Sequence, residues 1–154
     1  MRLAFAIALS ILCLPCVAQS SGKVEVFPAA QIHGQFAQLA QDAKAKGSSG
    51  ATLGDYGSHS LKLNERTASG GAEIHAHFDD VILVTEGKAT LITGGEVVDP
   101  HAGSNGETTG SAIRNGTVQS ILAGDLVHIP AGTPHQLLIA AGTKYSALVI
   151  KVRE

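Results

Sequence analysis

Two histidines one residue apart, followed by two carboxylates, are the residues of this sequence best suited to chemistry. They form the run His75-Ala76-His77-Phe78-Asp79-Asp80. Side chains alternate between the two faces of a β-strand, so we expect His75 and His77 to point to the same side, together with Glu73. Two imidazoles and a carboxylate on one face are typical of half of a divalent metal site.

The other half of such a site must come from elsewhere in the chain. His135 is the strongest candidate, because it directly follows the rigid Pro- and Gly-containing corner 130–134. His59 is a weaker candidate on an expected strand over 58–66, where it shares the apolar face with Leu61 and Leu63. We expect this face to look into the core, which makes His59 either a pocket residue or a hydrogen-bonded core histidine.

The composition favours a single all-β domain after a short N-terminal segment. The chain has 154 residues, of which 44% are hydrophobic, so a substantial core can form. Eighteen glycines indicate many tight turns. The net charge of −2 comes without any block of like charge, so neither nucleic-acid nor anionic-membrane binding is indicated.

Residues 1–18 have the pattern of a secretory signal peptide. A basic Arg2 precedes an apolar run, and small residues lead to a predicted cut after Ala18. We therefore expect an exported protein, periplasmic or extracellular, with no membrane association after cleavage. Lipidation at Cys16 is the alternative, but the preceding residues suit it poorly. Cys13 and Cys16 both lie in this segment, so the mature chain would form no disulfide.

The rest of the chain divides into residues 19–57 and a β-domain over 58–154. Apolar residues at helical spacing after Pro28 predict an amphipathic helix over 29–46, with a short strand before it and a Gly- and Ser-rich linker after it. Short strands with regular turns follow, including a tight turn at 86–88 and a long loop over 99–110. This pattern favours a small antiparallel barrel or a jelly roll.

The spacing of the histidine run resembles the first conserved motif of the cupin superfamily. That motif has a Gly, a His-x-His pair, a Glu and, after six intervening residues, another Gly; the matching residues are Gly71, His75, His77 and Gly87. Counting back from Gly87 places Asp80 at the Glu position. The gap from His77 to Asp80 is two residues instead of the usual three or four.

The second cupin motif is matched without a gap. It has a Gly, five residues, Pro-x-Gly, two residues and a His, which here are Gly124, Pro130, Gly132 and His135. The resemblance covers about residues 58–152. It implies a cupin-like jelly-roll β-barrel carrying one N-terminal helix.

The resemblance also implies a divalent metal ion, whether Zn, Fe, Mn, Ni or Cu, held by His75, His77, Asp80 and His135. Glu73 or Asp79 are the alternatives for the carboxylate ligand, and whichever acid does not ligate would support a ligand from behind. The implied function is a small-molecule metalloenzyme of dioxygenase, isomerase or lyase type. The alternatives are a barrel without metal, a non-catalytic module for a small ligand or metal, and a structural subunit. Cupins commonly form homodimers, so a dimer is expected here as well.

Overall fold

The computed structural model describes residues 22–154, and the predicted signal peptide lies outside the described residues. This part of the chain contains one α-helix, a short 3-10 helix and twelve strands. Their bounds are α1 Ala29–Lys46, β1 Ser48–Asp55, β2 His59–Arg66, β3 Ala72–His75, β4 Phe78–Thr93, β5 Glu96–Val98, β6 His101–Ala102, η1 Ser104–Gly106, β7 Glu107–Gly110, β8 Ala112–Arg114, β9 Thr117–Leu122, β10 Leu126–Ile129, β11 His135–Leu138 and β12 Tyr145–Arg153. In this part of the chain, no helix has the length and apolar character needed to cross a membrane.

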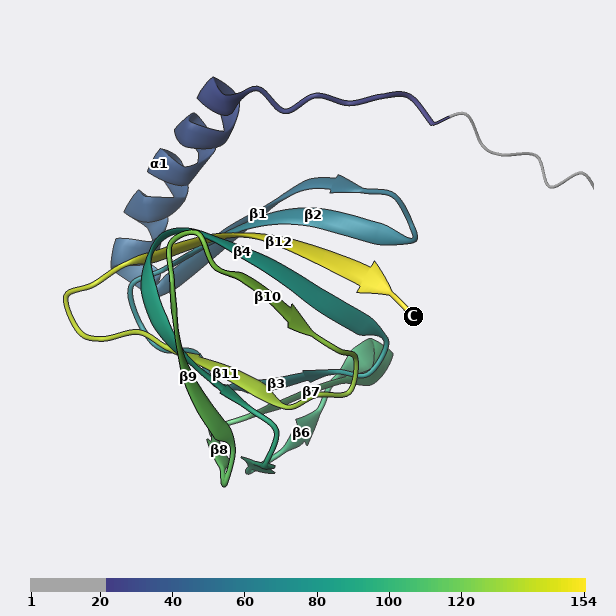
Figure 1. The fold of residues 1–154 in the computed structure, drawn as a ribbon, viewed down its shortest axis with the longest axis vertical. Helices are drawn as coiled ribbons and strands as arrows, with labels where there is room; N and C mark the ends of the chain where they lie inside the picture. Colours follow the sequence, from purple (N-terminus) through teal and green to yellow (C-terminus); the bar gives the residue numbers. More distant parts are fainter. Residues whose placement is uncertain (1–21) are drawn as a thin grey trace, which may run out of the picture.

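The strands form two facing layers that share the long strand β4. One layer contains β1, β2, β12 and β10 beside the first half of β4, and the other contains β6, β7, β3, β11 and β9 beside its second half. Figure 1 shows the two layers one above the other, with β4 passing between them. All pairings are antiparallel, and their order is an open path and not a closed ring. This architecture confirms the all-β prediction with one N-terminal helix.

Strand β4 changes layers at Gly87, where the sequence predicts a tight turn between two strands. The strand instead continues through a bend, with φ of +77° at Gly87. A Cβ atom at this position would overlap the carbonyl oxygen of Lys144 on the neighbouring strand connection. Glycine is therefore required both for the positive φ and for the close backbone approach.

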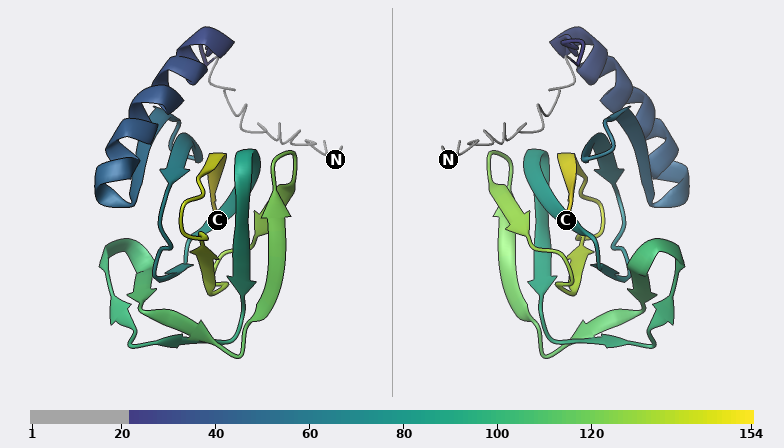
Figure 2. Two further views of the ribbon diagram at one scale, coloured as in Figure 1. Left: turned by 90° about the vertical axis from the view of Figure 1, so that its left-hand side faces the viewer. Right: turned by 90° about the vertical axis from the view of Figure 1, so that its right-hand side faces the viewer.

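Helix α1 begins and ends where the sequence predicts, after Pro28 and before Gly47. Gly47 adopts φ of +85° and donates its N–H to the carbonyl of Ala43, a common way for helices to end. The helix packs on the outer side of β1 and β2, burying Leu39 and Ala43 (Figure 2).

Two predictions next to the helix are wrong. The expected linker over 47–57 is largely strand β1, which pairs with β2 at the edge of the sheet. Residues 23–27 form no strand. Backbone pairing to β2 gives the Gly- and Ser-rich segment a regular structure that its composition does not indicate.

The two faces of β2 are the reverse of those predicted. Leu63 and Glu65 are each 1% exposed, and Glu65 borders the space beneath helix α1. The polar residues that alternate with them, Lys62, Asn64 and Arg66, face the interior between the two layers. Because helix α1 packs on the outer side of β2, the apolar face of this strand is buried outside the interior and the polar face can line the cavity.

The hydrophobic core lies between the layers at the end where β4 bends. Its buried members are Ile82, Val84, Ala89, Leu91, Ile121, Ile129, Ile139, Tyr145 and Ala147. The core fills only part of the interior, and the remaining space forms the cavity described next.

Candidate metal centre and adjoining cavity

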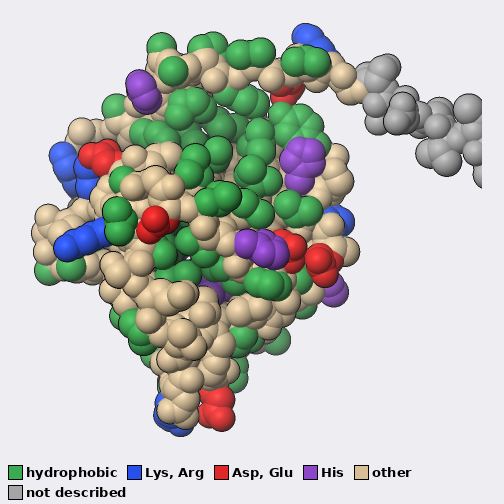
Figure 3. Space-filling view, viewed as in Figure 1, with side chains coloured by type: hydrophobic (Ala, Val, Ile, Leu, Met, Phe, Trp, Pro, Cys, Tyr) green, Lys and Arg blue, Asp and Glu red, His purple; other side chains and the backbone are tan. Residues whose placement is uncertain are grey.

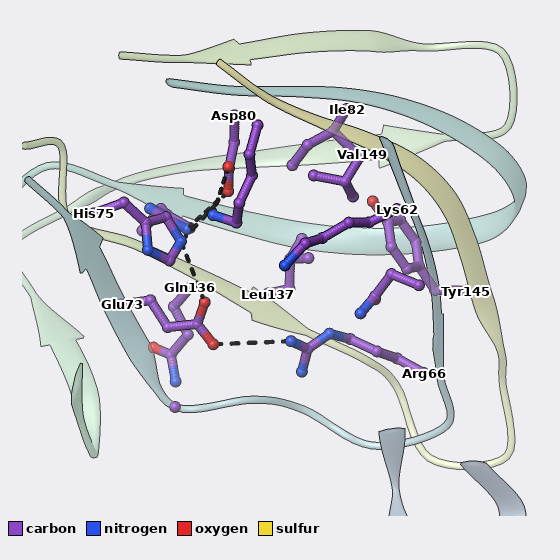
Figure 4. A pocket seen from close by; sticks show the side chains of 14 residues that line it. Lys62, Arg66, Glu73, His75, Asp80, Ile82, Gln136, Leu137, Tyr145 and Val149 are labelled. Atoms are coloured by element: carbon purple, nitrogen blue, oxygen red, sulfur yellow. Dashed lines mark hydrogen bonds and ion pairs between the residues drawn. The ribbon is translucent and has the colours of Figure 1, made fainter. Parts of the chain in front are cut away.

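A cavity of about 200 Å³ lies between the two layers. Side chains from strands of both layers line it, as Figure 4 shows at close range. They include four candidate metal ligands, three cationic side chains and an apolar wall. The lining residues are Lys62, Asn64, Arg66, Gly71, Glu73, His75, Asp80, Ile82, His135, Gln136, Leu137, Tyr145, Val149 and Lys151.

Glu73, His75 and His135 form a compact group of potential metal ligands. One ligand atom from each lies within 4.8 Å of the others. Glu73 and His75 are two residues apart on β3, so their side chains lie on the same face of the strand and both line the cavity. His135 of β11 pairs directly with Glu73. The two imidazole rings are 5.0 Å apart between centroids. Pairing between β3 and β11 thus brings His75 of the first motif close to His135 of the second, as the sequence predicts.

Asp80 joins this group from strand β4. Its Oδ2 lies 3.4 Å from His75 Nε2 and 3.8 Å from His135 Nε2, and the side chain is buried. The donor set is then two imidazole nitrogens and two carboxylates. Such mixed N and O ligands suit divalent first-row metals and fit the predicted cofactor class.

This geometry changes the register in which the first motif is read. Glu73 occupies the place of the first motif histidine and His75 that of the second. Four residues separate His75 from Asp80, and this gap lies in the three-to-four range of the motif. The short gap noted in the sequence arises from counting from His77.

The expectation that His77 shares the inward face with His75 is wrong. Strand β3 ends at His75, and His77 lies exposed in the turn that leads into β4. Its ring lies against Gly106 of η1 and does not line the cavity. The alternation rule fails because it holds only within a strand, and the strand ends one residue before Ala76-His77.

The two buried histidines are held through their Nδ1 atoms. The Nδ1 of His135 lies 3.0 Å from the carbonyl oxygen of Thr133, and the Nδ1 of His75 contacts the carboxylate of Glu107. These acceptors assign the proton to Nδ1 in each neutral ring and direct the Nε2 lone pairs towards Asp80. Both imidazoles therefore have the orientation that a metal ion bound at Nε2 would require.

The pKa values of the two rings move in opposite directions. Burial lowers the pKa of His135, outweighing the Thr133 carbonyl and the Asp80 charge. Burial also disfavours protonation of His75, but the contacts with Asp80 and Glu107 outweigh it and raise the pKa of His75. A bound cation would replace the proton of His75 as the partner of these carboxylates.

Glu107 is a site residue that the sequence analysis misses. It lies in the segment 99–110, which was expected to be a loop, but which forms β6, η1 and β7. Strand β7 pairs with β3 and sets Glu107 directly opposite His75. The consecutive threonines Thr108 and Thr109 are the one local signal for a strand here.

Asp79 lies outside the cavity and serves the corner that precedes His135. Its carboxylate accepts the N–H of Ala131 at 2.8 Å and contacts His128 Nε2 at 3.1 Å. Both contacts lower the pKa of Asp79. Asp79 therefore supports the position of His135 through the backbone and not through a ligand ring.

His59 also lies outside the candidate metal centre. It does not line the cavity beside the candidate metal centre, and its ring stacks on Tyr56 with centroids 4.9 Å apart. Its Nδ1 lies 3.0 Å from the Ser58 hydroxyl. The predicted inward placement of His59 is wrong, for the same reason that the two faces of β2 are reversed.

Cations from the neighbouring strands contact both carboxylates of the group. Lys151 Nζ lies 2.7 Å from Asp80 Oδ1, and an Arg66 nitrogen lies 3.9 Å from Glu73 Oε1. Burial by itself would raise the pKa of Asp80, but His75 and Lys151 outweigh it and lower that pKa. Asp80 is thus held as a carboxylate, the form in which it would bind a metal ion.

The surface around the fold mixes polar and apolar regions. On the face shown in Figure 3, acidic and histidine side chains lie near one another at the right, while hydrophobic side chains cover much of the upper part. Leu126 and Leu83, which are directly paired on β10 and β4, are among the exposed hydrophobic residues of the protein.

Solved structures with the same fold include cupin domains. The chain superposes on the cupin domain of Cnp3 from Schizosaccharomyces pombe with a TM-score of 0.52 at 10% identity, covering 70% of this chain and 61% of that one. For the polyketide cyclase RemF from Streptomyces resistomycificus the TM-score is 0.51 at 19% identity, covering 71% and 67%. A cupin-2 domain from Rhodospirillum rubrum gives 0.50 at 17% identity, covering 70% and 61%. No protein-family model and no curated protein matches the chain.

Proposed function

We propose that this protein of cupin fold binds one divalent metal ion through Glu73, His75, Asp80 and His135. The observation that carries the proposal is the convergence of two imidazoles and two carboxylates from three strands on one end of a cavity. The metal, when bound, would supply Lewis acidity or an open position for a small molecule or O₂. The chain itself orients the two rings through Thr133 and Glu107 and holds the small molecule in the cavity.

A small-molecule metalloenzyme of dioxygenase, isomerase or lyase type fits this arrangement. The polyketide cyclase among the similar structures shows that the fold supports enzymes. The second candidate is a non-catalytic barrel that binds a small ligand. The contacts of Lys151 with Asp80 and of Arg66 with Glu73 favour it, because both carboxylates have cationic partners without a metal.

Elemental analysis of the mature protein, purified without chelator, tests the metal site. We expect about one equivalent of metal in the wild type, and its loss in the His75→Ala, His135→Ala and Glu73→Gln variants. His77→Ala is the matched control and should keep its metal, since His77 lies exposed outside the group. Wild-type protein that takes up none of Zn, Fe(II), Mn, Ni and Cu would contradict the proposal and leave the ligand-binding barrel.

We also propose that the protein is exported and cleaved after Ala18. The basis is the apolar N-terminal run with small residues before the predicted cut. N-terminal sequencing of protein recovered from outside the cytoplasm should begin at Gln19. An intact Met1 on that protein, or a lipid attached to Cys16, would contradict this proposal.

A further inference from the structure

The end of the cavity away from the candidate metal centre is cationic. Lys62 and Arg66 lie four residues apart on the inward face of β2, and Tyr145 of β12 pairs directly with Arg66. Lys62 pairs in the same way with Val149. Figure 4 shows these side chains on one side of the cavity and His75 with Asp80 on the other. The cavity therefore has two chemically distinct ends.

Polar atoms at the cationic end lack hydrogen-bond partners within residues 22–154, although the Arg66 guanidinium also reaches Glu73 of the candidate metal centre. The Tyr145 hydroxyl is buried on a residue that is 1% exposed, and it makes no hydrogen bond. The buried Nε of Arg66 is likewise unbonded, and Lys62 forms no salt bridge with any described carboxylate. Buried polar groups are nearly always hydrogen-bonded, so the Tyr145 hydroxyl and the Arg66 Nε indicate a missing partner, and the half-buried Lys62 lines the same cavity.

The missing partner must be an acceptor with negative charge. Lysine and arginine side chains can only donate hydrogen bonds. Burial raises the pKa of Tyr145 to about 12, so its hydroxyl also carries a proton to donate at neutral pH. Among the lining residues, three carry positive charge and two carry negative charge, which leaves an excess positive charge for a ligand to balance.

The side chains in the middle of the cavity indicate that the central part of the ligand is apolar. Ile82, Leu137 and Val149 form an apolar wall between the two ends. The volume of about 200 Å³ lies below the roughly 300–1,000 Å³ of typical drug-sized ligand sites. A short carbon chain fits this wall better than a hydrated inorganic ion does.

We propose that the cavity binds a small organic carboxylate, whose carboxylate group contacts Lys62, Arg66 and Tyr145 and whose carbon body extends towards the candidate metal centre. The inference rests on the proposed function only in that the carbon body would lie beside a bound metal ion. The contact of the anion with the cationic end needs no metal, so the two proposals can fail separately.

The test is titration of the mature protein with propionate, lactate and succinate, followed by ¹H–¹⁵N NMR, in metal-free and metal-loaded forms. Propionamide, lactamide and succinamide are the neutral counterparts of these probes. We expect at least one acid to bind the metal-free form, and its amide to bind at least about tenfold more weakly. Shifted amide signals should include those of Lys62 and Tyr145.

Two variants test the assigned contacts. Lys62→Met keeps the side-chain length and should weaken carboxylate binding by at least about tenfold, and Tyr145→Phe by about three- to tenfold. Tyr145→Phe should not lower the melting temperature, because the hydroxyl makes no hydrogen bond within the described chain. Arg114→Met, at an exposed residue of strand β8 that does not line the cavity, is the matched control and should bind as the wild type does.

The outcomes separate this inference from the metal proposal. Carboxylate binding that depends on Lys62 supports the inference, whether or not elemental analysis finds a metal. Equal binding of acids and amides, unchanged binding in both variants, or binding of inorganic phosphate with no carboxylate bound would overturn it. Metal uptake by Lys62→Met at the wild-type level would show that this variant binds carboxylates more weakly without having lost its metal site.

Discussion

Glu107 controls the orientation of the His75 ring from outside the ligand group. Its carboxylate contacts Nδ1, so Nε2 remains directed at Asp80 and His135. Residues that support a ligating histidine from behind typically contribute 10–100-fold to metal affinity. We therefore expect Glu107→Ala to lower metal affinity by about 10–100-fold while the fold is retained, as measured by competition with a chromophoric chelator.

The control for this experiment is Glu96→Ala, which removes an exposed carboxylate from strand β5. It should leave metal affinity unchanged. An unchanged affinity in Glu107→Ala would mean that Glu107 does not orient His75.

The identity of the candidate ligands could be predicted from the sequence in part. His75, Asp80 and His135 come from the two recognised motifs, and the structure brings them together. Alternation with His75 predicts Glu73 as an alternative ligand. The same alternation predicts His77 wrongly, because the end of a four-residue strand has no clear signal in the sequence. Glu107 could not be found, since its position depends on pairing between β3 and β7.

At the level of the elements, the bend in β4 depends on a residue without a side chain. At Gly87, alanine would have to adopt a positive φ and would meet the carbonyl of Lys144. A positive φ alone costs an L-residue about 1–2 kcal/mol, and the overlap adds to this. We expect Gly87→Ala to lower the free energy of unfolding by about 3 kcal/mol or more, as measured by urea denaturation.

Gly94→Ala provides a matched comparison for the backbone term. Gly94 has φ of +70°, but a Cβ atom there meets nothing within 4 Å. Its cost should be about 1–2 kcal/mol. Equal losses in the two variants would show that the close approach to Lys144 is relieved at little cost.

The corner before His135 depends on the ionised form of Asp79. Hydrogen bonding by Ala131 and His128 lowers the pKa of Asp79 from its ordinary value of 3.8. A carboxyl with a lowered folded-state pKa contributes its full stability above pH 3.8 and loses it as the pH falls through the folded-state value. Asp79→Ala should therefore lower the melting temperature at pH 7, with a smaller difference from wild type as the pH falls below 3.8.

Differential scanning fluorimetry of the wild type and Asp79→Ala between pH 7 and pH 3 measures this difference. Glu96→Ala, which removes an exposed acid, should show no such trend. A melting-temperature difference that stays constant with pH would mean that the charge of Asp79 does not hold the corner.

The elements themselves were predictable to different degrees. Helix α1 has a Pro start, a Gly end and a periodic apolar stripe, and all three are local signals. Strand β1 has none of these, because pairing with β2 determines it. The faces of β2 were reversed because both faces have partners, the helix outside and the cavity inside. Alternation shows that two faces differ but not which one faces inward.

At the scale of the whole molecule, the position of helix α1 accounts for the polar lining of the cavity. Because α1 covers the apolar side of β2, the polar side is free to face the interior with Lys62 and Arg66. The interior then combines a hydrophobic core at one end with a charged cavity at the other. A small two-layered β-domain can in this way carry a polar site without losing its core.

A homodimer, which the resemblance to cupins implies, is a prediction at the scale of the whole molecule. Leu83 and Leu126 are paired side by side on the outer face and are 39% and 70% exposed. Stable protein interfaces often have apolar centres, and a symmetric dimer would place such a face against its own copy. We expect analytical ultracentrifugation to give twice the monomer mass at micromolar concentration, and Leu126→Lys to give the monomer mass.

Val26→Lys is the control for the dimer, since Val26 is 78% exposed and precedes the helix, outside strands β4 and β10. It should leave the mass unchanged. The two lysine variants change the charge equally, so a difference between them isolates the contribution of the β4–β10 face. A wild-type protein that stays monomeric at about 100 μM, far above the dissociation constants of most specific complexes, would refute the dimer and leave this apolar face exposed in the functional molecule.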